Sequence, residues 1–323
     1  MGREGEWLEQ PPDSPVDVAR WRADEEFGIY PEGARDKSLL YSPAPAPYPF
    51  LAPNHRYLFK HAFDRYPDQF WAEIIAYRVG CLLGVAVPPA FVAWNTDTGV
   101  CGALIEWFLG YPAEPEERYV PGGDIMSSII SGYERMRGHQ HNFQGIERYL
   151  SILETNEQLV GDWLGWWCDT LLFDALIGNT DRHQDNWGLL WKSGPAARMA
   201  PAFDNGTSLG HEIFADNMPA FSDSARIRSY IARGAHHMRW DIADGRPARH
   251  PALIQRLLER YPDRQDQVIN RLHAFNVSAS RAMITGMTEF NIPVPLSPQR
   301  ADFVCRLIEA RYSTLLHALT KLP

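Results

Sequence analysis

The pattern of apolar and polar positions predicts short strands in the first hundred residues of the chain. Residues 56–60 form an aromatic and apolar run that ends in Lys60, which is typical of a strand. Residues 88–94 and 100–107 indicate two further strands, joined by a turn at 95–99. A β-rich region is therefore expected at the start of the chain.

Helical periodicity first appears at residues 67–78. Asp68 stands where an N-cap residue belongs, and apolar residues then recur every three or four positions. Glu73 interrupts the apolar character, 13 residues after Lys60. An amphipathic helix is predicted here, with Glu73 as the expected partner of the Lys60 ammonium. A solvated glutamate on the helix face and a snorkelling surface lysine are the alternative interpretations.

Longer helical patterns dominate after residue 124. The segment 157–177 is apolar on nearly all sides, so it is expected to be a buried central helix. Residues 110–124 read as a linker or flap, and the stretch from 207 to about 250 as irregular structure. The other predicted helices lie at about 125–137, 143–154, 250–276 and 301–319.

The most informative stretch is the polar loop that follows the central helix. The helix is expected to end near Gly178, and the loop carries Asp181, His183 and Asn186. A strand pair is then expected to bring Asp204, the first residue of an Asp-Asn-Gly segment, to the same place. A plain helix C-cap with turn residues, followed by a hairpin turn at Asp-Asn-Gly, is the simpler alternative.

These residue types match the needs of phosphoryl transfer. Transfer of a γ-phosphoryl group requires a carboxylate that orients the attacking hydroxyl, and oxygen ligands that hold magnesium against the phosphates. Asp181 suits the first role. Asn186, five residues later, and Asp204 suit the second role. The hypothesis is a shared cleft in which these side chains meet Lys60.

Composition narrows the class of protein further. At 323 residues and 45% hydrophobic content, the chain can bury a large core and is expected to form two lobes. A net charge of −9 argues against a nucleic-acid-binding surface spread over the whole molecule, although a local basic patch is compatible with it. The four cysteines are far apart and indicate neither disulfides nor zinc. Without a signal-like N-terminus or a long apolar run, a cytoplasmic protein with no membrane span is expected.

The loop motif carries a resemblance to a known family. Gly-Asn-Thr-Asp-Arg-His-x-x-Asn followed by Phe-Asp-Asn-Gly resembles the HipA-like kinases, and it is also similar to the type II phosphatidylinositol 4-kinases. The resemblance implies an α+β, bilobal protein-kinase-like fold that uses ATP and Mg²⁺. Its parts are expected to be an N-terminal arm at 1–27, a small β-rich N-lobe at 28–108 and a mainly helical C-lobe at 109–323. The arm, acidic and without periodicity, is expected to be loosely held.

The same resemblance assigns roles to individual residues. It implies that Asp181 is catalytic, that Lys60 holds ATP phosphates and that Glu73 fixes Lys60. Asn186 and Asp204 are the implied magnesium ligands.

The remaining nucleotide contacts are expected from the backbone. The chain has no Gly-x-Gly-x-x-Gly, so a turn that carries Gly33, Arg35 and Lys37 is expected to contact the phosphates instead. We call this turn the phosphate loop. At the interlobe linker, the Glu106 carbonyl and the Phe108 amide are the expected adenine contacts. HipA-like kinases can phosphorylate a serine of their own phosphate loop, so the resemblance implies Ser38 or Ser42 as candidates, and an ordinary exposed serine is the alternative interpretation.

The phosphate acceptor is left open by the sequence. Serine or threonine of a protein substrate is favoured, with an inositol lipid as the alternative. No basic amphipathic helix or lipidation cluster supports the lipid. A catalytically silent, kinase-shaped binding module is the third hypothesis, although neither the lysine nor a magnesium ligand is missing. An antitoxin-type partner is implied by the resemblance alone, and no direct contact with nucleic acid is expected.

Overall fold

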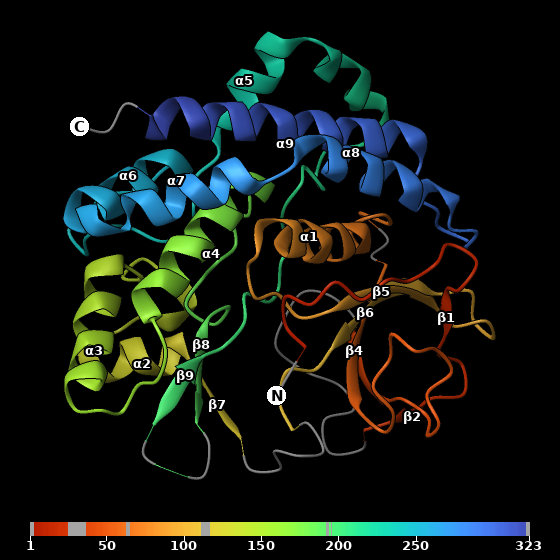
Figure 1. Ribbon diagram of the computed structural model, residues 1–323, viewed down its shortest axis with the longest axis horizontal. Helices are drawn as coiled ribbons and strands as arrows, with labels where there is room; N and C mark the ends of the chain where they lie inside the picture. The colour runs from red at the N-terminus through yellow and green to blue at the C-terminus, as the bar shows by residue number, and fades with distance from the viewer. Residues whose placement is uncertain are drawn as a thin grey trace.

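The computed structural model describes residues 3–24, 37–62, 65–110, 117–191, 194 and 196–320. The chain is α+β, with a curled β-sheet beside a mainly helical part (Figure 1). The N-terminal residues lie with the sheet, and the C-terminal helices cross over both parts. Across the described residues, no helix combines the length and the apolarity that spanning a bilayer requires.

The sheet has six strands in the order β1-β5-β6-β4-β3-β2. β6 is central and pairs antiparallel with β4 and with β5. In this register Lys60 lies opposite Ala103, and Tyr57 lies opposite Glu106. The three strands predicted from the sequence are present as β4 (Arg56–His61), β5 (Ala90–Trp94) and β6 (Cys101–Glu106), and β5 and β6 have slightly shorter ends than expected. The sheet is completed by β1 (Val16–Asp17), β2 (Arg22–Ala23) and β3 (Lys37–Tyr41).

The helix α1 (Phe70–Leu83) packs on one side against β5 and β6. Its other side is covered by the C-terminal helices α8 and α9, so it is buried almost all round rather than amphipathic (Figure 1). The expected cap is also wrong. Gln69 is the N-cap residue and makes no side-chain cap, while Asp68 accepts a hydrogen bond of 2.8 Å from Arg300 Nε.

The central helix of the helical part is α4 (Trp163–Ile177), six residues shorter at its start than predicted. Asp162 caps it by accepting a hydrogen bond from the Gly165 amide, and Gly178 ends it with φ +69°. A left-handed residue suits glycine, which has no Cβ to strain. The surrounding elements are α2 (Gly122–Ile129), η1 (Arg135–Arg137), α3 (Phe143–Thr155), α6 (His250–Arg260), η3 (Pro262–Arg264), α7 (Gln265–Ala274), α8 (Val277–Gly286), η4 (Met287–Glu289) and α9 (Pro298–Leu319).

A small three-stranded sheet lies beneath α4. Its order is β7 (Arg118–Pro121), β8 (Gly188–Trp191) and β9 (Ala197–Met199). β7 occupies part of the segment that was expected to be a linker or flap. The polar loop 179–187 connects α4 to β8, and β9 leads to Asp204. The predicted strand pair before Asp204 is therefore confirmed.

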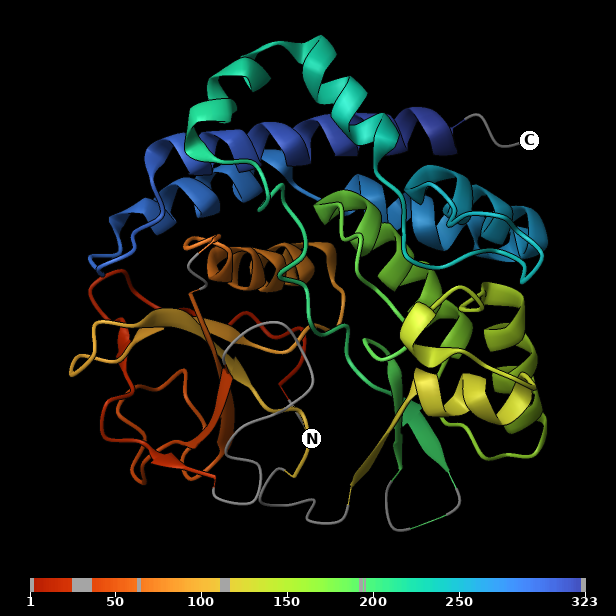
Figure 2. The same ribbon diagram turned by 180° about the vertical axis from the view of Figure 1, so that it is seen from behind.

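The segment after Asp204 differs from the sequence expectation. It passes between α1 and α4 and then forms η2 (Ala215–Ser222) and α5 (Ser224–Arg233) over α9 (Figure 2). Irregular structure was predicted because arginines and serines obscure the apolar period. In α5 only Ile227 and Ile231 are buried, which is too few to mark a helix in the sequence.

The first residues of the chain are packed and not loosely held. β1 pairs parallel with β5, and β2 pairs antiparallel with β3. Val16 is fully buried in the core of the sheet. Two short strands and a few apolar contacts were not visible in the sequence because the partners lie some 20 to 80 positions away.

Candidate active site

Three of the predicted side chains meet at one ammonium group. Lys60 Nζ donates to Glu73 Oε1 at 2.6 Å and to Asp204 Oδ1 at 2.8 Å. Lys60 and Glu73 are buried, whereas 35% of the Asp204 side chain is exposed. A buried lysine requires such partners, because an unpaired ammonium in the interior costs several kcal/mol. We name Lys60, Glu73 and Asp204 the Lys60 cluster.

Each member of the Lys60 cluster comes from a different element. Lys60 is in β4, Glu73 is in the first turn of α1, and Asp204 follows β9. Glu73 also accepts a hydrogen bond of 2.9 Å from the Asn205 amide through its second oxygen. Asp204 has φ +56°, a conformation that aspartate adopts more readily than most side chains. Glu73 thus holds both the lysine and the backbone beside Asp204.

The loop that carries Asp181 is fixed by its own side chains. The Asp181 amide donates to Asn179 Oδ1 at 2.9 Å, and Asn186 Nδ2 donates to the Asp181 carbonyl at 2.7 Å. Thr207 Oγ1 lies 3.5 Å from Asp181 Oδ2, at the limit of a hydrogen bond. Asn179 and Asn186 are buried, while Asp181 is partly exposed. The loop therefore leaves its carboxylate partly open to solvent.

The donor set at this site is suited to a hard divalent cation. Asn186 uses its amide nitrogen toward Asp181, so its Oδ1 remains as an oxygen ligand. Asp204 contributes a carboxylate that is partly exposed. Magnesium prefers oxygen donors, and in phosphoryl-transfer sites it takes one or two from the protein and the rest from phosphate and water. The residues present fit such an ion.

Arg182 joins the Asp181 loop to the Asp204 segment. Its side chain is completely buried and donates to Asp174 at 3.0 and 2.8 Å and to Asn205 Oδ1 at 2.7 Å. It also donates to the carbonyls of Asn186, at 3.1 Å, and Phe203. A guanidinium presents five donors in a fixed plane, so one side chain can reach four residues.

Asp174, in the last turn of α4, is the acid that neutralises Arg182. Burial alone would raise the pKa of this carboxyl, but Arg182 and His236 hold the pKa of Asp174 well below its usual range. His236 Nε2 lies 3.2 Å from Asp174 Oδ2. Asn179 Nδ2 donates to the other oxygen at 3.1 Å. We name Arg182, Asp174 and His236 the Arg182 cluster.

The linker residues close the other end of the site. Glu106 is the last residue of β6 and its side chain is completely buried. The Phe108 ring packs against Phe203 with centroids 5.2 Å apart, next to Asp204. The position of the Glu106 carbonyl and the Phe108 amide as adenine contacts stays a prediction.

The expected phosphate-loop residues are only partly described. Gly33 and Arg35 lie outside the described residues. Lys37 is in β3 and lies opposite Lys60 in the strand register. Ser38 Oγ is 3.4 Å from His61 Nε2. Ser42 is buried and donates to the Ala52 carbonyl at 2.6 Å, which makes it the less accessible of the two serines.

His183 makes a hydrogen bond within the loop that carries Asp181. Its Nδ1 accepts a hydrogen bond of 3.1 Å from the Asp185 amide within the loop. The rings of His183 and His237 lie 5.8 Å apart. Burial, together with the neighbouring His183 and His236, lowers the pKa of His237 to about 4. His237 is therefore neutral near pH 7.

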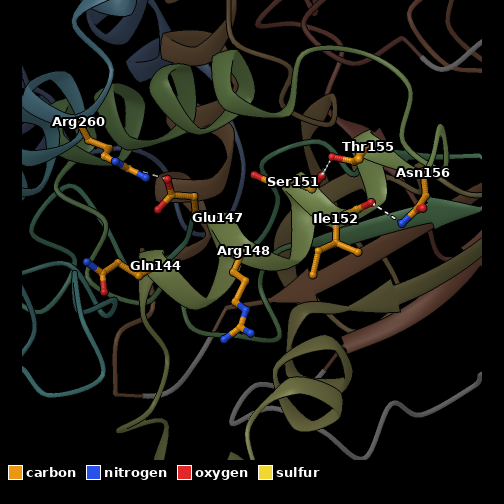
Figure 3. A pocket seen from close by; sticks show the side chains of 8 residues that line it. All are labelled: Gln144, Glu147, Arg148, Ser151, Ile152, Thr155, Asn156 and Arg260. Atoms are coloured by element: carbon orange, nitrogen blue, oxygen red, sulfur yellow. Dashed lines mark hydrogen bonds and ion pairs between the residues drawn. The ribbon is translucent and has the colours of Figure 1, made fainter.

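A wide depression of about 510 Å³ on the outer side of α3 contains none of these groups (Figure 3). It is open to solvent, and Glu147 there accepts a hydrogen bond from Arg260. Its lining is largely polar and comes from α3, its C-cap residue Asn156 and the end of α6. The lining residues are Gln144, Glu147, Arg148, Ser151, Ile152, Thr155, Asn156 and Arg260.

Four side chains that support the site, Arg182 among them, were missed in the sequence. Gln69 Nε2 donates to the Gly206 carbonyl at 3.0 Å, and Arg300 donates to Asp68 and to two carbonyls of the segment after Asp204. Arg3 donates to Glu106. Only Arg182 had a usable signal, because Asp174 needed a buried cation nearby. The others lie too far away in sequence to be paired without coordinates.

The sequence matches the family described as HipA-like C-terminal domain over residues 30–264. The chain belongs to this family. The matched range includes all the residues of the Lys60 cluster, the Asp181 loop and both linker residues. A search of curated proteins found no match.

Several solved structures are similar to this HipA-like chain, and the first of those named here shares its fold. The crystal structure of the Helicobacter pylori proinflammatory kinase CtkA is similar with a TM-score of 0.71 and 15% identity, covering 94% of this chain and 96% of that one. HipA of Shewanella oneidensis MR-1, in a complex with HipB and operator DNA, has a TM-score of 0.49 and 15% identity, covering 97% and 68%. The golgi casein kinase has a TM-score of 0.41 and 13% identity, covering 91% and 72%.

Proposed function

We propose that this protein is an ATP- and magnesium-dependent phosphotransferase, with serine or threonine of a protein as the phosphate acceptor. The observation that carries the proposal is the Lys60 cluster, in which one ammonium bridges Glu73 and Asp204 at 2.6 and 2.8 Å. Two carboxylates on one lysine, with Asp181 on an adjoining loop, form a site where phosphates can be held and a hydroxyl oriented. Membership of the family agrees with this chemistry.

Nucleotide binding is assigned to the β-rich side of the site. Lys60 would contact the phosphates of ATP, and Glu73 would keep the ammonium in place by its 2.6 Å contact. Lys37, opposite Lys60 in β3, and Arg35 are proposed to contribute further positive charge, and the backbone amide around Gly33 is proposed to contact the phosphates. The Glu106 carbonyl and the Phe108 amide would contact adenine.

Magnesium is assigned to Asn186 and Asp204, whose oxygens come from adjoining segments that Arg182 holds together. When bound, the ion neutralises charge on the phosphates and fixes their orientation. Asp181 would accept a hydrogen bond from the acceptor hydroxyl, orient that oxygen toward the γ-phosphorus and take its proton. The hydrogen bond that the Asp181 amide donates to Asn179 Oδ1, and the one that Asn186 Nδ2 donates to the Asp181 carbonyl, hold Asp181 in place for this task.

The test is transfer of labelled phosphate from γ-labelled ATP by the purified full-length protein, with magnesium. Asp181→Asn keeps the size of the side chain and removes the base, so transfer is expected to fall by about a hundredfold or more. Asp97→Asn is the matched control, because Asp97 lies in the exposed turn 95–99 away from the site. Transfer by Asp181→Asn at the wild-type rate would falsify the assignment.

The acceptor is tested with a cell lysate separated into protein and lipid fractions, and with phosphatidylinositol vesicles. Label on serine or threonine of protein is expected. Label in phosphatidylinositol would instead select the lipid acceptor and reject the protein acceptor. An antitoxin-type partner remains a prediction from the resemblance, and a cytoplasmic location remains a prediction from the absence of a signal-like N-terminus and of a long apolar run in the sequence.

A further inference from the structure

A buried carboxylate lies beside the proposed adenine contacts. The Glu106 side chain is 0% exposed at the end of β6. Arg3 Nε donates to Glu106 Oε1 at 3.2 Å, Arg3 Nη2 donates to Oε2, and the Tyr57 hydroxyl donates to Oε2 at 2.9 Å. A two-pronged guanidinium contact of this kind fixes both oxygens of a carboxylate. The orientation of Glu106 is therefore set by a residue 103 positions earlier.

The chain from Arg3 then follows a fixed path across the site. The Gly5 amide donates to the Val87 carbonyl at 3.0 Å. Gly5 has φ +80°, and a Cβ there would lie 3.2 Å from the Val85 carbonyl oxygen. Both facts favour glycine at this turn. We name residues 3–10 the strap.

The strap next contacts the helix that carries Glu73. The Tyr77 hydroxyl donates to the Glu6 carbonyl at 2.6 Å and accepts from the Leu8 amide at 3.0 Å. Tyr77 is fully buried and lies four residues after Glu73, which places both on one side of α1. The Trp7 ring covers the Arg78 guanidinium at 4.7 Å from its centroid. The strap and the Lys60 cluster therefore share one helix.

The far end of the strap is bound to the sheet. Gln10 Nε2 donates to the Val92 carbonyl at 2.9 Å, and the Val92 amide donates to Gln10 Oε1 at 2.8 Å. The buried Gln10 side-chain amide thus makes with Val92 of β5 the pair of hydrogen bonds that the backbone of a neighbouring strand would otherwise make. With both ends bound, the strap connects the end of β6, the helix α1 and the strand β5 in one piece.

We propose that the strap is a positioning element for the nucleotide, and that Arg3 sets the affinity for ATP and the preference for adenine over guanine. The inference rests on the proposed function. Arg3 does not touch the nucleotide. Arg3 acts through Glu106. The carboxylate that Arg3 holds and the backbone carbonyl that would contact adenine both belong to Glu106, so a change in the direction of one changes the direction of the other. A displaced carbonyl would lose the hydrogen bond from the adenine amino group, and guanine offers no such donor at that position.

The experiment compares Arg3→Ala and Arg3→Lys with wild type in the full-length protein. The readouts are KM and kcat with ATP and with GTP, at a temperature well below each Tm. Arg3→Ala is expected to raise KM for ATP about tenfold, with kcat within about twofold and a smaller preference for ATP over GTP. Arg3→Lys is expected to have a KM for ATP between those of wild type and Arg3→Ala, since lysine keeps the charge without the two-pronged contact.

Two further variants separate positioning from folding. Arg20→Ala is the control, because Arg20 is in the same N-terminal segment, its side chain is 88% exposed and its contact with Asp97 is 3.9 Å long. If Arg3→Ala does not fold, Arg3→Ala/Glu106→Gln leaves no unpaired buried charge and is measured in its place. A lower Tm with unchanged KM and unchanged base preference would overturn the inference. Wild-type protein that binds no ATP would overturn both this inference and the proposed function.

Discussion

The Lys60 cluster and the Arg182 cluster are built from the same kinds of group and differ in access to solvent. In the Lys60 cluster one partner, Asp204, has 35% of its side chain exposed to solvent. In the Arg182 cluster the charged side chains of Arg182 and Asp174 are 0% exposed. The first arrangement can exchange a carboxylate for a phosphate. The second is satisfied internally and holds two segments together.

The comparison predicts opposite responses to removal of the cation. Lys60→Met is expected to reduce phosphate transfer by about a hundred- to a thousandfold, because a donor aimed at the phosphates is lost. Its free energy of unfolding is expected to fall by less than that of Arg182→Met, because the partly exposed Asp204 is solvated and Glu73 keeps its bond from the Asn205 amide. Transfer assays and urea unfolding measure the two quantities. If Lys60→Met transfers phosphate at the wild-type rate, the proposed difference in role between the Lys60 cluster and the Arg182 cluster is wrong.

Arg182→Met is expected to act mainly on stability. It leaves Asp174 buried with no arginine, which typically costs about 3–5 kcal/mol. Urea unfolding checks this loss. Replacing Arg182, Asp174 and His236 together by apolar residues of similar size is the control, and it is expected to recover much of the loss because no buried charge is then left over. A single variant as stable as wild type would show that the buried pair does not hold the fold.

The smallest expected effect concerns pH and the neutral His237 beside the Asp181 loop. Its pKa in the folded state is about 4, below the ordinary value of 6.5, because of burial and the nearby His183 and His236. The unfolded state therefore binds the proton first as pH falls. The contribution to stability is complete above pH 6.5 and is lost as pH falls from 6.5 toward 4, by about 1–3 kcal/mol.

His237→Gln tests this contribution. The variant is expected to show a shallower loss of stability between pH 6.5 and 4 in urea unfolding. Part of the slope remains, because burial also lowers the pKa of His141 and of His250. The pKa of Asp174 is depressed, so its contribution is present above the ordinary aspartate range and is lost only at lower pH. If the free energy of unfolding falls equally steeply between pH 6.5 and 4 in His237→Gln and in wild type, His237 does not contribute to the pH dependence of stability.

The sequence predicted most of the site because its chemistry is local. Asp181 and Asn186 share one loop, and a motif of a few residues identifies both. Lys60 and Glu73 are 13 positions apart on a strand and the next helix, so their pairing follows from ordinary kinase geometry. The 2.6 Å contact between them confirms the expected ion pair, while their catalytic roles stay predictions.

What the sequence did not reveal depends on distant contacts. The strap was expected to be loosely held because residues 1–20 show no periodicity, yet it is bound to Tyr77, Val92 and Glu106, which lie far along the chain. The helix α5 was missed because it buries only two side chains. α1 was expected to be amphipathic because its second covering layer, α8 and α9, lies some 200 residues later. The spacing of apolar residues shows that one face of a helix is buried, but it does not show that a second element covers the opposite face.

The double covering of α1 limits how this protein can be switched. Trp71 on α1 donates to the Val294 carbonyl at 3.1 Å, and Arg300 of α9 is bound to Asp68 just before the helix. Swinging α1 outward to separate Glu73 from Lys60 would require these C-terminal segments to leave as well. That movement would bring a large apolar interior into water, at about 25 cal/mol for each Å². Separating Glu73 from Lys60 by tilting this helix is therefore costly.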